Sequence, residues 1–237
     1  MFQTDPLSLI VLFVGLSLLP FVAMVATSYL KIVVVMSLIR NALGIQSIPP
    51  NMVINALAMI LTFYIMAPMA SESWNIAKAE LARSKSAAKA NAATSTTNYQ
   101  PPTTNSFFET DAIVKAAEPF RTFLSSHTSD RERAFFVHTA ERLWAKSEDE
   151  LATVDPESFY ILIPSFCVSE LTKSFQIGFL VYLPFIAIDI IVSNILLAMG
   201  MMMVSPVTIS LPFKLLLFVM VDGWTLLIQG LIRGYVI

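Results

Sequence analysis

The sequence contains few of the residues that enzymes and metalloproteins use for chemistry. Its single cysteine, Cys167, excludes an intrachain disulfide and a cysteine zinc site, and we expect it to be a buried, inert thiol. Two histidines, His127 and His138, form no His-Glu-x-x-His motif, and we expect both on solvated faces. The seven glycines form no phosphate-binding loop. We therefore expect no catalytic residue, no cofactor and no metal site.

Charge is also scarce and is unevenly distributed. Only 14% of the 237 residues are charged, against about a quarter in soluble domains, and 56% are hydrophobic. Residues 1–70 hold three charges, residues 71–160 hold 23, and residues 161–237 hold six. The formal net charge of −2 argues against a nucleic-acid partner, because phosphate binding requires a basic face. The chain is therefore apolar at both ends and polar in the middle.

Long apolar runs occupy both ends of the chain. A helix needs about 20 apolar residues to cross a bilayer core, and four segments reach this length. They are residues 6–30, 41–71, 174–213 (interrupted only by Asp189) and 215–232 (interrupted only by Asp222). The first segment lacks the basic start and the cleavage site of a secretory signal peptide.

Prolines divide these runs into bent helices. Pro49-Pro50 predicts a turn before a helix that starts near Asn51, and Pro68 should end or kink that helix. Prolines inside or at the edge of the other runs predict further bends, at Pro20, Pro164, Pro184 and Pro212. We expect two hydrophobic helical hairpins, within residues 1–77 and 161–237.

The middle of the chain differs from both ends. Residues 78–106 are rich in Ala, Ser, Thr and Asn, which predicts a low-complexity, flexible insertion with a helical start at most. Residues 107–160 recover helical periodicity, with a kink expected at Pro119 and a capping box at Ser129 and Glu132. The expected fold is therefore all-α: kinked hydrophobic hairpins flank a small helical domain outside the membrane, in a membrane-associated oligomer.

Four methionines in five positions, Met199 and Met201–Met203, stand between two apolar segments, followed by Pro206. Methionine is flexible and carries a polarizable thioether, so such a cluster can adapt its shape to whatever it contacts. The pattern suggests an apolar, deformable loop close to water. The alternative is a buried connection between two core helices.

Charged residues inside the apolar runs need partners. Glu170 and Lys173 stand three positions apart on one predicted helix and can pair, whereas Asp189 and Asp222 each stand alone. The available cations are Lys31, Arg40, Lys173 and Lys214, in this chain or in a neighbouring copy. Two interpretations remain: structural pairing, which we favour because no chain of carboxylates and histidines is present, and an ion relay.

Several ordered motifs resemble the type III secretion export-apparatus family of flagellar FliP and injectisome SctR. They cover both apolar ends and, more loosely, residues 107–160. These motifs lie at residues 38–44 (LIRNALG), 48–51 (IPPN), 62–68 (TFYIMAP), 163–171 (IPSFCVSEL), 175–179 (FQIGF), 184–189 (PFIAID), 197–203 (LAMGMMM), 211–215 (LPFKL) and 221–224 (VDGW). The absence of an evident N-terminal signal favours the injectisome branch, and Ser205-Pro206 replaces the two prolines typical of flagellar members.

The resemblance implies a pore subunit of a secretion machine. Several copies, in a pentamer-like arrangement, would assemble with SctS-like and SctT-like subunits into a cone-like pore for unfolded secreted polypeptides, beneath the inner rod or needle and near the export gate. Met201, Met202 and Met203 would form a gasket on the axis. In this family the hairpins pack largely against each other and are raised out of the bilayer plane.

Basic residues near the ends of the apolar runs predict how the protein lies in the membrane. Basic residues between the first two helices (Lys31, Arg40) and Lys214 after the third favour the cytoplasmic side, which places the middle domain in the periplasm of a bacterial inner-membrane protein. Arg40, Glu170, Lys173, Asp189, Lys214 and Asp222 are expected contacts between helices or subunits. An ion-coupled transporter that uses Asp189 and Asp222, or a membrane-anchored scaffold, are the alternatives.

Overall fold

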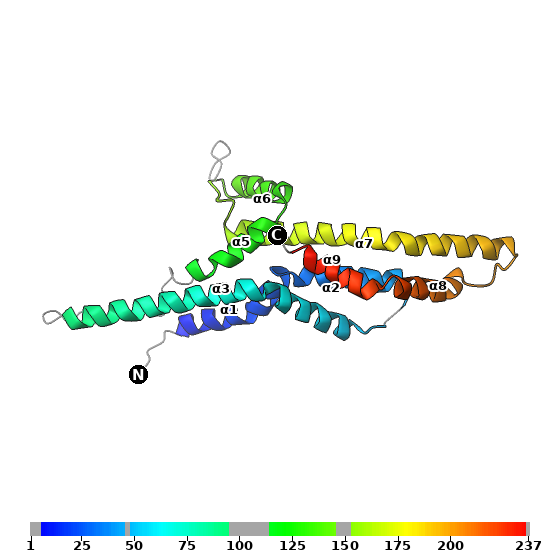
Figure 1. Ribbon diagram of the computed structural model, residues 1–237. Helices are drawn as coiled ribbons and strands as arrows, with labels where there is room; N and C mark the ends of the chain where they lie inside the picture. Colours follow the sequence, from blue (N-terminus) through cyan, green and yellow to red (C-terminus); the bar gives the residue numbers. More distant parts are fainter. Residues whose placement is uncertain (1–5, 46–47, 95–113, 146–152, 236–237) are drawn as a thin grey trace.

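The computed structural model describes residues 6–45, 48–94, 114–145 and 153–235, and their regular elements are helices, as expected for an all-α protein (Figure 1). Residues 114–116 are also helical. The helices are α1 (Pro6–Val25), α2 (Tyr29–Ala42), α3 (Asn51–Thr94), α5 (Glu118–His127), α6 (Asp130–Leu143), α7 (Phe159–Ala198), α8 (Pro206–Met220) and α9 (Gly223–Arg233).

The N-terminal hairpin has one bent arm and one long arm. Helices α1 and α2 meet at an angle of 55° and together form the first arm, and α3 packs back against α2. Pro68 lies inside α3 and does not end it. The ribbon of α3 changes direction between its teal and cyan parts (Figure 1).

Helix α3 continues past the expected domain boundary at residue 77. It runs to Thr94, so residues 78–94 of the expected flexible insertion are helical, and residues 95–106 lie outside the described residues. Alanine, lysine, arginine and glutamate dominate residues 77–90, and all four are strong helix formers. On this extension Glu80 pairs with Arg83 at 3.0 Å and with Lys115 at 3.2 Å.

The C-terminal hairpin also has a long arm and a bent arm, but here the long arm comes first in the chain. Helix α7 is the long arm, with 40 residues that include Pro164 and Pro184. Helices α8 and α9 form the bent arm and meet at 59°. The bend lies at Asp222, whose φ of 53° is in the left-handed region.

The middle domain consists of α5 and α6, which both pack against α7. Pro119 lies in the first turn of α5, directly after a break at Ala117 that separates α5 from the helical residues 114–116. A proline in the first turn loses no helical hydrogen bond. Ser129 precedes α6 as the capping box predicted, but its side chain makes no capping hydrogen bond. Its backbone N–H instead donates to Ser169 Oγ at 3.0 Å, which joins the middle domain to α7.

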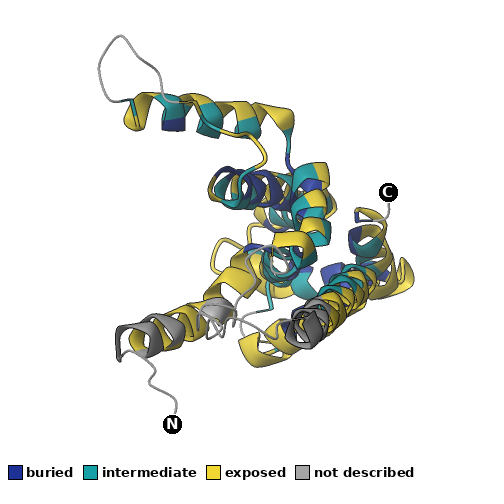
Figure 2. Cartoon of the chain, turned by 90° about the vertical axis from the view of Figure 1, so that its left-hand side faces the viewer, coloured by how far each residue is buried: buried dark blue, intermediate teal, exposed yellow. Residues whose placement is uncertain are grey.

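The main core lies where the two hairpins meet. Helix α2 packs along α7, and at Gly178 an added Cβ would lie 2.3 Å from Leu38 Cδ1. A second, smaller core of Ala26, Leu124, Leu162 and Phe166 lies beneath α5. Elsewhere the long helices are largely uncovered, and Figure 2 shows yellow, exposed stretches along them beside intermediate and buried ones.

The lengths of the helices agree with the four apolar runs of the sequence. Two helices are long and apolar enough to cross a membrane, Asn51–Glu80 and Phe159–Ala198. The count rises to four if each bent pair forms one span. The third predicted run, however, is divided between α7 and α8 by the methionine-rich segment, because Gly200 adopts a positive φ and Pro206 begins a new helix.

Candidate functional site: a methionine loop and two buried ionic clusters

The methionine loop, residues 199–205, begins at a glycine-dependent helix end. Gly200 has a φ of 75°, a conformation that glycine adopts without steric penalty. The N–H of Gly200 donates to the carbonyl of Leu197 and the N–H of Met201 to that of Leu196, both at 3.0 Å. This pair of bonds is a Schellman motif, which stops α7 and turns the chain sharply. The next three residues are therefore presented at a tip.

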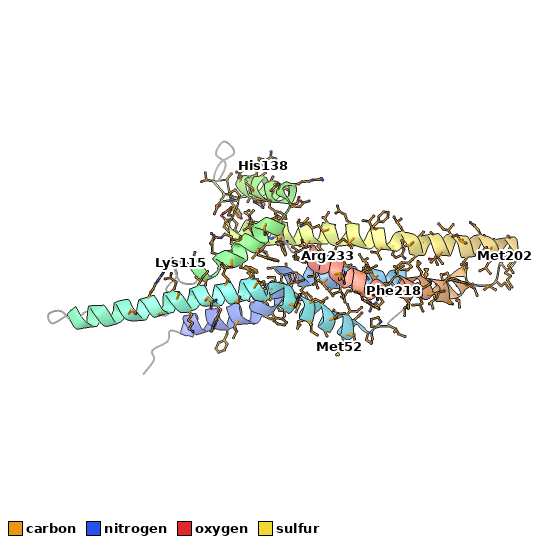
Figure 3. The ribbon with its side chains drawn as sticks, in the orientation of Figure 1. Met52, Lys115, His138, Met202, Phe218 and Arg233 are labelled. Atoms are coloured by element: carbon orange, nitrogen blue, oxygen red, sulfur yellow. The ribbon has the colours of Figure 1, made fainter. Side chains whose placement is uncertain are left out.

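The three side chains after this turn project from the protein. Met201, Met202 and Met203 are 45%, 82% and 102% exposed. Met202 lies at one end of the molecule, where α7 stops and the chain turns back towards α8 (Figure 3). The alternative of a connection buried within the chain is therefore wrong. Apolar side chains exposed at a tip require another surface to cover them.

The first ionic cluster is centred on Glu170, which has no exposed side-chain surface. Its carboxylate pairs with Lys31 at 3.0 Å and with Lys173 at 3.1 Å, and it accepts a hydrogen bond from the Tyr235 hydroxyl. The predicted pair of Glu170 and Lys173 is thus present, and Lys31 from α2 completes it. We call Lys31, Glu170, Lys173 and Tyr235 the Glu170 cluster.

The Glu170 cluster also reaches the middle domain. Lys173 Nζ donates to the backbone carbonyl of His127 at 2.6 Å, and the Lys31 ammonium lies 3.7 Å from the centre of the Tyr235 ring. The His127 ring packs against both Phe123 and Tyr235 and is buried, so its predicted solvated position is wrong. His138 does lie on an exposed face, 3.3 Å from Glu141. The cluster therefore joins α2, α5, α7 and the chain after α9.

The second ionic cluster lies nearer the methionine loop. Asp189 of α7 pairs with Lys214 of α8 at 2.6 Å, and the Ser210 hydroxyl donates to the same carboxylate at 2.5 Å. Lys214 Nζ also donates to the carbonyl of Ala42 at 3.3 Å, where α2 ends. A cation there complements the unpaired carbonyls of a helix C-terminus. We call Asp189, Ser210 and Lys214 the Asp189 cluster.

The two remaining predicted polar residues have no ion pair among the residues that the structure describes. Arg40 hydrogen-bonds Asn51 Oδ1 and the carbonyl of Pro49, so it holds the turn between α2 and α3. Asp222 precedes α9, but its side chain makes no capping hydrogen bond. The contacts within this chain thus account for Asp189 and not for Asp222.

Ser210 and Tyr235 belong to these clusters, but they could not be predicted from the sequence. A single serine or tyrosine in an apolar helix carries no pattern that separates it from its neighbours.

Cys167 is only partly buried. Within the described ranges, no three His, Cys, Asp or Glu residues stand close enough to hold a metal ion.

Comparison with known proteins gives consistent matches along the whole chain. The model of the FliP family matches residues 12–231. "Yop proteins translocation protein R" of Yersinia pestis is 47% identical over 98% of this chain and 97% of its own length. "Hypersensitivity response secretion protein HrcR" of Ralstonia nicotianae is 44% identical over 96% of each chain. "Flagellar biosynthetic protein FliP" of Agrobacterium fabrum is 37% identical over 93% of this chain and 80% of its own.

Proposed function

The chain belongs to the FliP family, and we propose that it is a pore-forming subunit of a bacterial type III protein-secretion export apparatus. Relatives named for translocation, for secretion and for flagellar biosynthesis support the general role. The observation that carries the pore role is the methionine loop, which exposes three adjacent thioether side chains at one end of the molecule. Loops from several copies meet on a common axis and close the passage.

Closure follows from the chemistry of this loop. A narrow ring of apolar side chains excludes water, and an ion cannot cross a dry constriction without losing its hydration. Methionine has three rotatable bonds and a soft sulfur, so the same ring can fold around an extended polypeptide of any sequence. The loop thus combines a tight seal at rest with tolerance for varied substrates.

The uncovered helices support assembly with partners. Each of the two long helices contains an apolar stretch of 18 residues. Only 17% of this stretch in α3 and 11% of it in α7 are buried within the chain. These faces pack against further copies in a pentamer-like ring, against SctS-like and SctT-like subunits, and against lipid. The assembly belongs to the bacterial inner membrane, with the middle domain on the periplasmic side, the inner rod or needle above it and the export gate below.

The experiment that tests this proposal measures ion leakage through the assembled complex. Replacing Met201, Met202 and Met203 together with serine should raise the resting conductance, because hydroxyl groups hold water in the constriction. The matched control replaces Met52 and Met220, which are similarly exposed on α3 and α8, with serine. Unchanged conductance in a triple variant that still assembles would refute the gate.

A further inference from the structure

The C-terminal hairpin carries six charged side chains, and two of them find no counter-charge among the residues that the structure describes. Four belong to the Glu170 and Asp189 clusters. The other two are Asp222 and Arg233, which are both exposed and form no ion pair within the described ranges. They are opposite in sign and lie on the same arm of the hairpin. The chain thus leaves one acid and one base of this hairpin for a contact outside itself.

Asp222 and Arg233 cannot pair with each other in one chain. They stand at opposite ends of α9, a helix of 11 residues, so their backbones are about 16 Å apart at 1.5 Å per residue. Helices α8 and α9 together are apolar enough to form one broken membrane span. A lone charge on such an arm is costly when lipid or protein covers it, so each charge requires a partner from another molecule.

The carboxylate of Asp222 is held at a defined place, in the bend between α8 and α9. Its backbone is in the left-handed region, which aspartate enters more readily than most residues. Gly223 is buried against the Phe218 ring, where an added Cβ would lie 2.4 Å from Cε2, and Trp224 packs edge-on against the same ring. Figure 3 shows Phe218 nearer the methionine loop and Arg233 nearer the middle of the molecule. The two charges are therefore presented at separate, fixed positions.

We propose that Asp222 of one copy pairs with Arg233 of the adjacent copy, so that the α9 helices join the copies head to tail. This inference rests on the proposed function, which brings several copies into one ring. In such a ring each copy offers a different patch to each of its two neighbours. One acid and one base per chain, at the two ends of one helix, then satisfy each other at every contact. The planar arginine fork binds a carboxylate through two parallel hydrogen bonds, which also fixes how the copies are aligned.

One other cation of the hairpins, Arg40, also lacks a carboxylate within the described chain. Its guanidinium is already bound by Asn51 and by the carbonyl of Pro49, which makes Arg233 the better partner. The alternative explanation needs no second copy: an acid at the start of a helix and a base at its end both complement the dipole of that helix. The two explanations predict different results when the charges are exchanged.

The first experiment reverses the charges and measures the yield of the detergent-extracted, multi-copy complex by native mass spectrometry. Asp222→Arg and Arg233→Asp should each lower this yield on the order of tenfold, because like charges then meet at every contact between copies. The double variant should recover most of the yield, since the pair is only inverted. Losses that add in the double variant would overturn the inference, because exchanged charges oppose the helix dipole twice. Glu157→Arg, at an exposed acid outside α9, should assemble like the wild type.

A milder pair of substitutions covers the case in which arginine does not tolerate the left-handed backbone at 222. Asparagine suits that conformation, so Asp222→Asn should fold normally and should assemble less well. Arg233→Gln should then cause little further loss in the Asp222→Asn background, although it weakens assembly of the wild type. An equal loss in both backgrounds would show that the two residues are not coupled.

The second experiment measures proximity while both charges are kept. In a Cys167→Ser background, Val221→Cys and Gly234→Cys place one thiol beside each charge, and a short bis-maleimide links thiols that lie close together. The two thiols of one chain are too far apart to be linked, since they flank the whole of α9. A head-to-tail arrangement should give a ladder of linked copies, whereas chains with one of the two cysteines should stay unlinked. The absence of a ladder in the assembled complex would overturn the inference.

The two proposals fail separately. If the multi-copy complex forms and seals but shows neither the ladder nor the rescue by charge exchange, the pore subunit stands and the pairing is wrong. If the wild-type chain enters no multi-copy complex at all, the proposed function itself is wrong.

Discussion

Glu170 is the residue on which the most parts of the molecule converge. Its buried carboxylate faces the ammonium group of Lys173 on the same helix, and the ammonium group of Lys31 and the hydroxyl of Tyr235 from parts of the chain that are distant in the sequence. A buried ion pair adds little net stability relative to an apolar pair, but removal of one partner leaves an uncompensated charge. The cluster therefore matters chiefly as a requirement for correct packing.

Glu170→Gln should lower the free energy of unfolding by about 3 to 5 kcal/mol, because Lys31 keeps its buried ammonium and loses its counter-charge. Chemical denaturation of the detergent-purified protein measures the change. Glu157→Gln is the matched control, since Glu157 is exposed before α7 and its side chain forms no ion pair within the described chain. Equal stability of the two variants would contradict the role assigned to the cluster.

Asp189→Asn distinguishes structural pairing from ion coupling. Pairing predicts that the free energy of unfolding falls by roughly 2 kcal/mol. The variant leaves the ammonium group of Lys214 buried without a counter-charge, but the carboxylate of Asp189 is partly exposed, so the loss is smaller than for a fully buried pair. Pairing also predicts that the reversed pair, Asp189→Lys with Lys214→Asp, regains part of the loss. Thermal unfolding and secretion are measured together. Full stability with abolished transport would favour the ion-coupled alternative.

Residue identities were predictable where charge stands out against an apolar background. Glu170, Lys173, Asp189 and Lys214 could be selected for this reason, and the structure pairs all four. Which cation meets which carboxylate was not predictable, because the choice depends on how the hairpins pack. His127 shows the opposite failure: a polar residue in a polar segment is buried by the aromatic rings around it.

Among the elements, α2 and α7 form the contact that unites the hairpins. Leu38 fits against Gly178, where there is no room for a Cβ atom. Gly178→Ala should therefore destabilise the protein by about 1 to 3 kcal/mol, as overpacking does. Leu38→Ala in the same chain should recover part of the loss, and denaturation of the single and double variants measures the coupling.

Gly230→Ala is the matched control for that contact. Gly230 lies inside α9 with open space where its Cβ would be, so alanine should stabilise the protein by up to about 1 kcal/mol through helix propensity. Opposite signs at the two glycines are expected. A loss of the same size at both would show that steric conflict at Leu38 is not the cause.

The existence of most helices was predictable from apolar runs, breakers and periodicity. Their ends were less so, because prolines act differently with position: Pro119 begins α5, whereas Pro68 lies within α3. A proline inside a long helix removes one hydrogen bond without stopping the chain when neighbouring helices support it. Sequence alone does not reveal that support.

For the whole molecule, the sequence indicated two apolar ends and a polar middle. Helices α1 to α3 and α7 to α9 lie in the two end parts, α5 and α6 lie in the middle, and α3 runs past the expected boundary into the polar part. The way in which the hairpins join was hidden. Contacts between α2 and α7 link residues from opposite ends of the chain, and no local pattern encodes them.

Orientation in the membrane is tested by cysteine labelling in a Cys167→Ser background. Arg131→Cys on α6 should react with a membrane-impermeant maleimide added to the periplasm, since residue 131 is exposed on the middle domain. Met52→Cys, at the start of α3, should react only after the membrane is opened if the hairpins span the bilayer. Labelling at both positions shows raised hairpins, and protection of residue 131 refutes a periplasmic middle domain.

The hydrogen bond from Lys214 to the carbonyl of Ala42 spans 172 positions. At about 5 to 20 residues per second, a ribosome needs roughly 9 to 34 s to make the intervening chain. For most of that interval a nascent α2 lacks the helix against which it packs, and Lys31 lacks its carboxylate. The first hairpin must therefore wait, shielded by the insertion machinery or by lipid, for the second hairpin to emerge.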